Sequence, residues 1–105
     1  MKPSEMVQRL KDGEQPIDLS IQKWQDIVDG TGGDLASSNC ALCDTYTCHE
    51  CPLTVLMSDK CNDEGSTYDR YLWYEGTDET KRAKDMVKLL KKCKKAMTEV
   101  GLYKP

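Results

Sequence analysis

The sequence predicts a mainly α-helical fold, a small single domain of about four helices around a central metal-stapled cysteine loop. Apolar residues recur at helical spacing near both ends of the chain, which indicates amphipathic helices. Five of the six cysteines fall between residues 40 and 61. The chain has only 105 residues, 38% of them hydrophobic and none of them Phe, so its apolar core is thin and would gain from a cross-link.

We expect one domain over 1–105 with three sections. The N-terminal helices occupy 1–30, a cysteine-rich loop occupies 31–66, and 67–104 contains an aromatic segment followed by a basic C-terminal helix. Trp24 and Trp73, together with the five tyrosines, are expected to supply much of the bulk of the core.

Two helices are predicted in the N-terminal section. The first covers about 5–12 with Ser4 as its N-cap, and the second begins at Asp18 or Ser20 and runs to about Asp29. The apolar residues of the second helix recur at steps of three and four, which places them on one face: Ile17, Ile21, Trp24 and Val28.

The middle of the chain contains shorter elements. The glycine-containing segment 30–39 is predicted to be a linker, because it matches no phosphate-binding or calcium-binding pattern. An apolar patch at 53–57 fits a turn or short helix, and Ser66 or Thr67 is the expected cap of a helical aromatic segment.

The basic C-terminal helix has the clearest pattern. Thr77 is its expected N-cap and Gly101 its expected end. Its apolar seam steps by three and four residues and comprises Ala83, Met86, Leu90, Cys93, Met97 and Val100. Cys93 lies on this seam, so we expect it to be an inert core thiol.

Charge is distributed unevenly along the chain. Residues 1–80 contain six Lys and Arg against sixteen Asp and Glu, a balance of −10, whereas residues 81–105 contain nine against two, a balance of +7. This asymmetry fits a nucleic-acid-binding tail or a basic helix lying on an acidic body. The segment Met1–Glu5 has no apolar run and no stretch could span a membrane, so we expect a cytoplasmic protein without a secretory signal.

The cysteines form two Cys-x-x-Cys turns and one additional thiol. Such turns can direct two thiolates each toward a tetrahedral Zn²⁺, and four thiolates leave no open position for a catalytic water. A reducing compartment also favours metal over disulfides. The sequence therefore predicts one structural zinc ion with four ligands drawn from Cys40, Cys43, Cys48, Cys51 and Cys61.

Other cysteine chemistries stay open at this point. They are two disulfides or a redox dithiol, an iron–sulfur cluster, and unbridged thiols. The single histidine, His49, is expected to face solvent rather than bind metal. No catalytic constellation emerges, and we expect no enzyme activity.

A resemblance adds to these inferences. The chain contains a Trp-anchored helix around Trp24, the motif Asn39-Cys40-Ala41-Leu42-Cys43, Tyr46, Cys48-x-x-Cys51-Pro52-Leu53 and a later Cys61. This pattern, over roughly residues 17–74, resembles a group of small cysteine-motif proteins of bacteriophage genomes and prophage-bearing bacteria. The resemblance implies a phage accessory protein in the cytoplasm of a bacterial host.

Three functional hypotheses follow. The first is a zinc-binding interaction module that binds or inhibits a host protein through an acidic face comprising Asp44, Glu50, Asp59, Asp63, Glu64 and Asp69. The second is a nucleic-acid-binding regulator, which the overall acidity and the scarcity of arginine disfavour. Its phosphate-binding lysines would be Lys84, Lys88, Lys91, Lys92, Lys94 and Lys95. The third is a thiol redox protein.

Overall fold

The computed structural model describes residues 2–47, 49–73 and 79–103. Within these ranges it contains no strand, which confirms the mainly helical class. The helices exceed the expected four because the cysteine-rich section is itself partly helical. None of the described helices is long and apolar enough to cross a membrane. The elements are α1 (Pro3–Lys11), α2 (Pro16–Val28), the 3-10 helix η1 (Ala36–Asn39), α3 (Ala41–Thr45), α4 (Pro52–Met57), α5 (Thr67–Leu72) and α6 (Glu79–Glu99).

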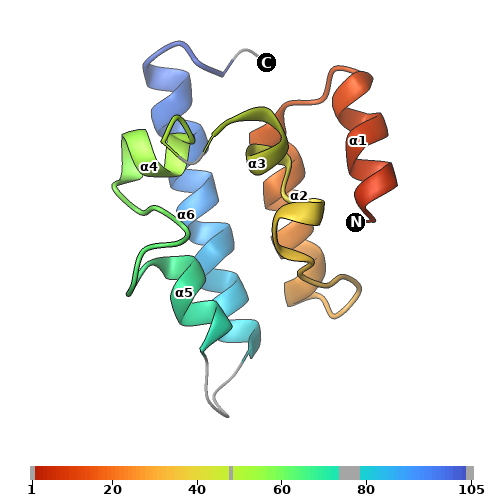
Figure 1. Cartoon of the computed structure of the whole chain (residues 1–105), viewed down its shortest axis with the longest axis vertical. Coiled ribbons are helices and arrows are strands. Elements are labelled where there is room, and N and C mark those ends of the chain that lie inside the picture. Colours follow the sequence, from red (N-terminus) through yellow and green to blue (C-terminus); the bar gives the residue numbers. More distant parts are fainter. Residues whose placement is uncertain (1, 48, 74–78, 104–105) are drawn as a thin grey trace.

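The longest described helix, α6, is the element around which α2, α4 and α5 pack. Helix α2 lies along one side of it, and α4 and α5 lie along the other (Figure 1). The predicted seam of α6 is buried at Ala83, Met86, Leu90, Cys93 and Met97, each at most 2% exposed. The seam prediction was wrong at its last position, because the helix ends at Glu99 and Val100 is 59% exposed.

The main core combines residues from five helices. Ile17 and Trp24 of α2 contact the seam of α6, and Leu42 of α3, Leu53 of α4 and Tyr71 of α5 complete the buried cluster. Trp24 is 4% exposed and meets the ring of Tyr71 edge-on, with the ring centroids 4.7 Å apart. It is therefore the core anchor that its position in the amphipathic pattern predicted.

Helix α1 belongs to a separate, smaller cluster. Met6 packs against Leu19 of α2 and Ala41 of α3, with Val7 and Leu10 of α1 at the edge. This cluster ties the N-terminal helix to the start of the cysteine segment.

The first two helices begin differently from the prediction. Each starts at a proline, Pro3 or Pro16, preceded by a residue whose side chain makes no capping hydrogen bond. Proline suits the first helical position because its φ is already helical and it lacks an amide hydrogen that would need a partner. Ser4, Asp18 and Ser20, the expected caps, lie inside the helices.

The aromatic segment gives one confirmed prediction and one correction. Ser66 caps α5, since its hydroxyl accepts a hydrogen bond from the amide of Asp69 at 3.0 Å. Trp73 does not fill the core as expected but is 72% exposed, because it lies just after the last turn of α5. The predicted cap Thr77 lies outside the described residues.

Candidate metal centre

The described cysteines of the segment 40–61 lie at the start of short helices, within one of them, and in a loop. Cys40 is the N-cap of α3 and Cys43 lies within it, Cys51 directly precedes α4, and Cys61 lies in the loop between α4 and α5. Pro52 at the first position of α4 fixes the direction in which the chain leaves Cys51. Cys48, the remaining predicted ligand, lies outside the described residues.

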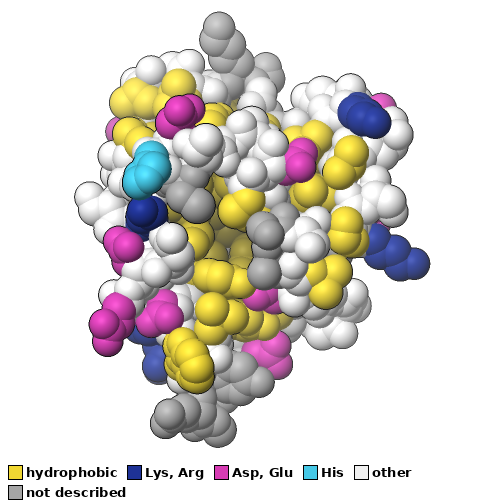
Figure 2. Space-filling model, viewed as in Figure 1, with side chains coloured by type: hydrophobic (Ala, Val, Ile, Leu, Met, Phe, Trp, Pro, Cys, Tyr) yellow, Lys and Arg dark blue, Asp and Glu magenta, His cyan; other side chains and the backbone are white. Residues whose placement is uncertain are grey.

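Two cavities bring these cysteines together. Cys40, Cys43 and Cys61 line a cavity of about 390 Å³ whose other walls are mainly apolar. Figure 2 shows it as a hollow floored by hydrophobic side chains in the middle of this face. A smaller cavity of about 20 Å³ is lined by Cys43, Cys51 and Cys61. Cys43 and Cys61 therefore line both cavities, and each of the four described cysteines of the segment lines at least one of them.

Hydrogen bonds favour the ionised form of the Cys40 thiol. The amide of Cys43 donates to Cys40 Sγ at 3.4 Å. The pKa of Cys40 is lowered to about 6, first by a hydrogen bond from the Cys43 side chain, then by the amides of Cys43 and Leu42 and the charge of Lys23, against the opposing effect of burial. A thiolate is the form of cysteine that binds a metal ion, so the turn is chemically prepared for this role.

Among the described residues, no three His, Cys, Asp or Glu side chains converge closely enough to hold a metal ion. The donor chemistry nevertheless fits Zn²⁺, because thiolates are its preferred ligands in closed structural sites. The metal site therefore remains a prediction from the spacing of the cysteines.

His49 and Cys93, which the sequence did not assign to the metal site, have the exposure that the sequence predicted. His49 is exposed, in agreement with a solvent-facing role. Cys93 is fully buried in the seam of α6, and burial together with the charge of Cys51 raises its pKa to about 11. A protonated thiol inside an apolar core is a packing residue rather than a ligand.

A buried polar network beside Cys40 was not predicted. Lys23 of α2 forms an ion pair with Asp34 of the linker, with Nζ and Oδ1 2.8 Å apart and the two side chains only 4% and 9% exposed. The hydroxyl of Tyr68 donates to Asp34 Oδ2 at 2.7 Å. Burial and this contact with a carboxylate raise the pKa of Tyr68. No local signal in the sequence marks this network, since Lys23 lies eleven residues from Asp34 and Tyr68 lies 34 residues from it.

Two carboxylates of the predicted acidic face form hydrogen bonds within the fold. Asp59 accepts hydrogen bonds from the amide and hydroxyl of Thr67, and Asp69 accepts one from the amide of Gly65. These two carboxylates stabilise the start of α5. The four exposed members of the set are Asp44, Glu50, Asp63 and Glu64.

The predicted phosphate-binding lysines divide into two groups. Lys94 forms an ion pair with Asp18 of α2 at 2.7 Å and lies over the ring of Tyr103, which itself donates to Asp18. These contacts raise the pKa of Lys94, first through the hydrogen bond to Asp18. The other five are exposed: Lys84, Lys88, Lys91, Lys92 and Lys95.

Comparison with known proteins adds no assignment. No protein-family model, curated protein or solved structure matches the chain. Its function is therefore inferred from the chemistry of its own residues.

Proposed function

We propose that the protein is a small zinc-binding, non-enzymatic interaction module in which one structural Zn²⁺ binds four of the five clustered thiols, those of Cys40, Cys43, Cys48, Cys51 and Cys61. The observation that carries this proposal is the sharing of Cys43 and Cys61 between two cavities, which together contact all four described thiols of the segment. The low pKa of Cys40 supports the same conclusion, because zinc binds thiolates. Four thiolates would close the coordination sphere, so the ion would be structural.

The zinc ion would stabilise a part of the fold that is otherwise weakly supported. Helices α3 and α4 contain only five and six residues. Helices of this length are not stable by themselves in water. A metal bound by residues at their ends would hold α3 against α2 and α4 against α6, which are the helices they contact. Metal binding would then be coupled to the folding of the middle third of the chain.

The biological role in this proposal follows from the resemblance and from the absence of a recognisable catalytic pattern in the sequence. The cysteine motif resembles that of phage and prophage accessory proteins, so we place the protein in the cytoplasm of a bacterial host, binding or inhibiting a host protein. The only histidine of the chain, His49, is exposed and sits within the metal-binding segment. That position suits a solvated side chain better than a general base.

The proposal is tested by native mass spectrometry and metal analysis of protein purified under reducing conditions. We expect one Zn²⁺ per chain and loss of helicity when a chelator removes it. Cys43→Ser and Cys61→Ser should lose the metal, because both residues line both cavities. Cys93→Ala is the matched control, since it removes a cysteine from the core and should keep the zinc.

Three results would contradict the proposal. If metal-free protein remains fully folded with chelator present, zinc has no structural role in this protein. A brown protein with visible absorption would show that the cysteines bind an iron–sulfur cluster instead of zinc. Equal zinc content in Cys43→Ser and wild type would show that the metal binds elsewhere.

A further inference from the structure

We infer that the outward face of α6 is a docking surface for an acidic amphipathic helix of a partner protein. This inference deepens the proposed function, because it names the chemistry of the partner. The surface, here called the lysine face, consists of exposed residues that fall within an arc of about 100° of the helix and span about 21 Å along its axis. They are Lys81, Lys84, Lys88, Lys91, Lys92 and Lys95.

The ammonium groups of the lysine face differ from the neighbouring cations in their ion pairs. Among the described residues, no carboxylate forms an ion pair with any of its six members. The neighbouring cations differ, since Lys94 pairs with Asp18 and Arg82 lies 3.8 Å from Asp85. Within the described residues, the acidic body therefore pairs with Lys94 but not with the lysine face. Six adjacent ammonium groups repel one another, and an acidic partner would relieve this repulsion.

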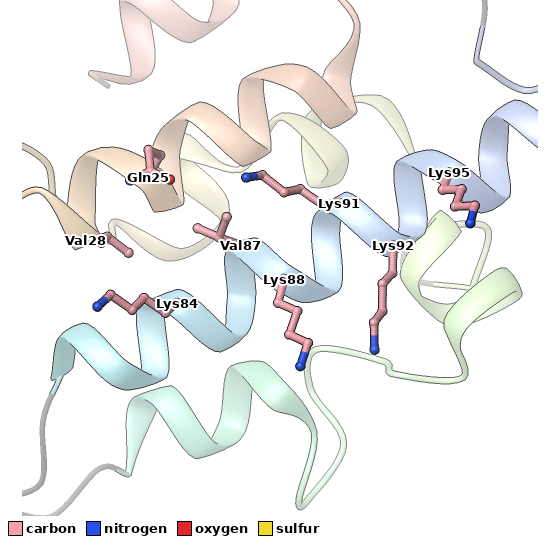
Figure 3. Close-up of a pocket in the computed structure, with 8 residues that line it drawn as sticks. All are labelled: Gln25, Val28, Lys84, Val87, Lys88, Lys91, Lys92 and Lys95. Atoms are coloured by element: carbon pink, nitrogen blue, oxygen red, sulfur yellow. The ribbon is translucent and has the colours of Figure 1, made fainter.

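A groove with an apolar floor runs beside these lysines. It has a volume of about 530 Å³ and lies between α2 and α6. Val28 of α2 and Val87 of α6 face each other across its floor, and Lys91 extends toward α2 (Figure 3). Lys88 and Lys92 extend from the opposite side of α6, where they also line a second groove of about 320 Å³. The lysine face is therefore a ridge with an apolar channel along one flank.

This combination of features fits an acidic amphipathic helix. Such a helix could place apolar side chains on Val28 and Val87 and direct carboxylates from its flanks toward Lys84, Lys91 and Lys95. A partner helix of about 14 residues would match the length of the lysine face, because both helices rise by the same distance per residue. Carboxylates spaced three and four residues apart would follow the spacing of the lysines.

The same features fit a nucleic acid less well. A phosphate backbone has no apolar group to place on Val28 and Val87. The face contains no arginine, which is the favoured side chain for paired contacts to phosphate. The chain as a whole carries a net charge of −3, which disfavours an extended polyanion more than a short acidic helix confined to the groove.

The test measures binding of two synthetic peptides of about 14 residues to the folded, zinc-loaded protein by fluorescence anisotropy. Both contain the same glutamates and leucines, but only the first places the leucines on one helical face. We expect the first peptide to bind and the scrambled peptide to bind at least about tenfold more weakly, because only the first can use the apolar floor. Affinity for the first peptide should also fall as salt rises.

Variants assign the site on the protein. Lys88→Gln/Lys91→Gln should weaken binding of the first peptide by roughly tenfold, since each lost pair contributes a fraction of the affinity. Lys2→Gln/Lys11→Gln is the matched control, because it makes the same change in net charge at exposed residues of the N-terminal region. Its affinity should equal that of wild type.

The outcomes separate this inference from its alternatives. Equal binding of both peptides would show that the apolar groove does not contribute to binding. Equal effects of the two double variants would show that the peptide does not bind at the lysine face. If a DNA duplex of about 16 base pairs binds more tightly than the first peptide, and Lys88→Gln/Lys91→Gln abolishes that binding, the partner of the lysine face is a nucleic acid rather than an acidic helix. Zinc content is read separately by mass spectrometry, so failure of the peptide to bind a zinc-loaded protein would reject the docking surface alone.

Discussion

Breaking the buried ion pair between Lys23 and Asp34 should strongly destabilise the protein. Both side chains are at least nine-tenths buried, and the carboxylate also accepts a hydrogen bond from Tyr68. Asp34→Ala would leave the ammonium group of Lys23 in a low-dielectric environment beside the ring of Trp24, 5.1 Å from its centroid. Removing one partner of a buried pair costs about 3–5 kcal/mol, because the remaining charge loses its compensation.

The measurement is urea unfolding followed by tryptophan fluorescence, with a thermal melt by circular dichroism. For a domain of this size each kcal/mol lowers the melting temperature by about 4–8 °C, so Asp34→Ala should melt at least about 12 °C below wild type. Lys23→Met/Asp34→Leu should recover much of the loss, because apolar residues of similar volume can replace a buried pair at little cost.

An exposed ion pair provides the control. Arg9 and Glu14 are also in contact, at 2.6 Å, but their side chains are 32% and 42% exposed. Glu14→Ala should therefore cost less than about 1 kcal/mol. If Asp34→Ala and Glu14→Ala destabilise equally, burial does not determine the strength of these pairs and the reasoning is refuted.

Three further predictions concern the core and the titrating groups. Leu90→Asp should unfold most of the protein at 25 °C, because it places an unpaired charge beside Met86 in the core; a wild-type melting curve would show that α6 does not pack on the body. Tyr68 has a raised pKa in the folded state, so its contribution to stability should be complete below about pH 10 and lost at higher pH, and Tyr68→Phe should flatten the dependence of melting temperature on pH between about 9 and 11. Cys93 should resist iodoacetamide at neutral pH until the protein unfolds, whereas Cys40 should react in chelator-treated protein; mass spectrometry of digested protein would detect early labelling of Cys93 and contradict the burial argument.

Local patterns in the sequence were sufficient to locate α1, α2, α5 and the buried face of α6, but they did not predict η1 or α3. The step of three and four residues from Ala83 to Met97 identifies one side of a helix, because side chains at that spacing project in the same direction. The cap at Ser66 was also predictable, since its hydroxyl bonds an amide only three residues away. Interactions of this range depend on neighbours in the chain, which the sequence displays directly.

The cysteine turns are an intermediate case. Their spacing predicts two thiols per turn, and the amide of Cys43 indeed bonds the sulfur of Cys40 within the first turn. Which further thiols approach them depends on how α4 returns the chain toward α3. In the structure Cys61 and Cys43, eighteen positions apart in the chain, line the same two cavities.

Only the tertiary structure decided which charged groups are buried and which remain exposed. Lys23 pairs with Asp34 eleven residues away, and Tyr68 reaches the same carboxylate from 34 residues away, so no local pattern indicates the network. The charge asymmetry of the chain allowed either a neutralised or an exposed basic helix. Packing of the seam against α2, α4 and α5 turns the opposite side of α6 outward, and this leaves the lysine face exposed. Burial depends on contacts between segments distant in sequence, and those contacts exist only in the folded chain.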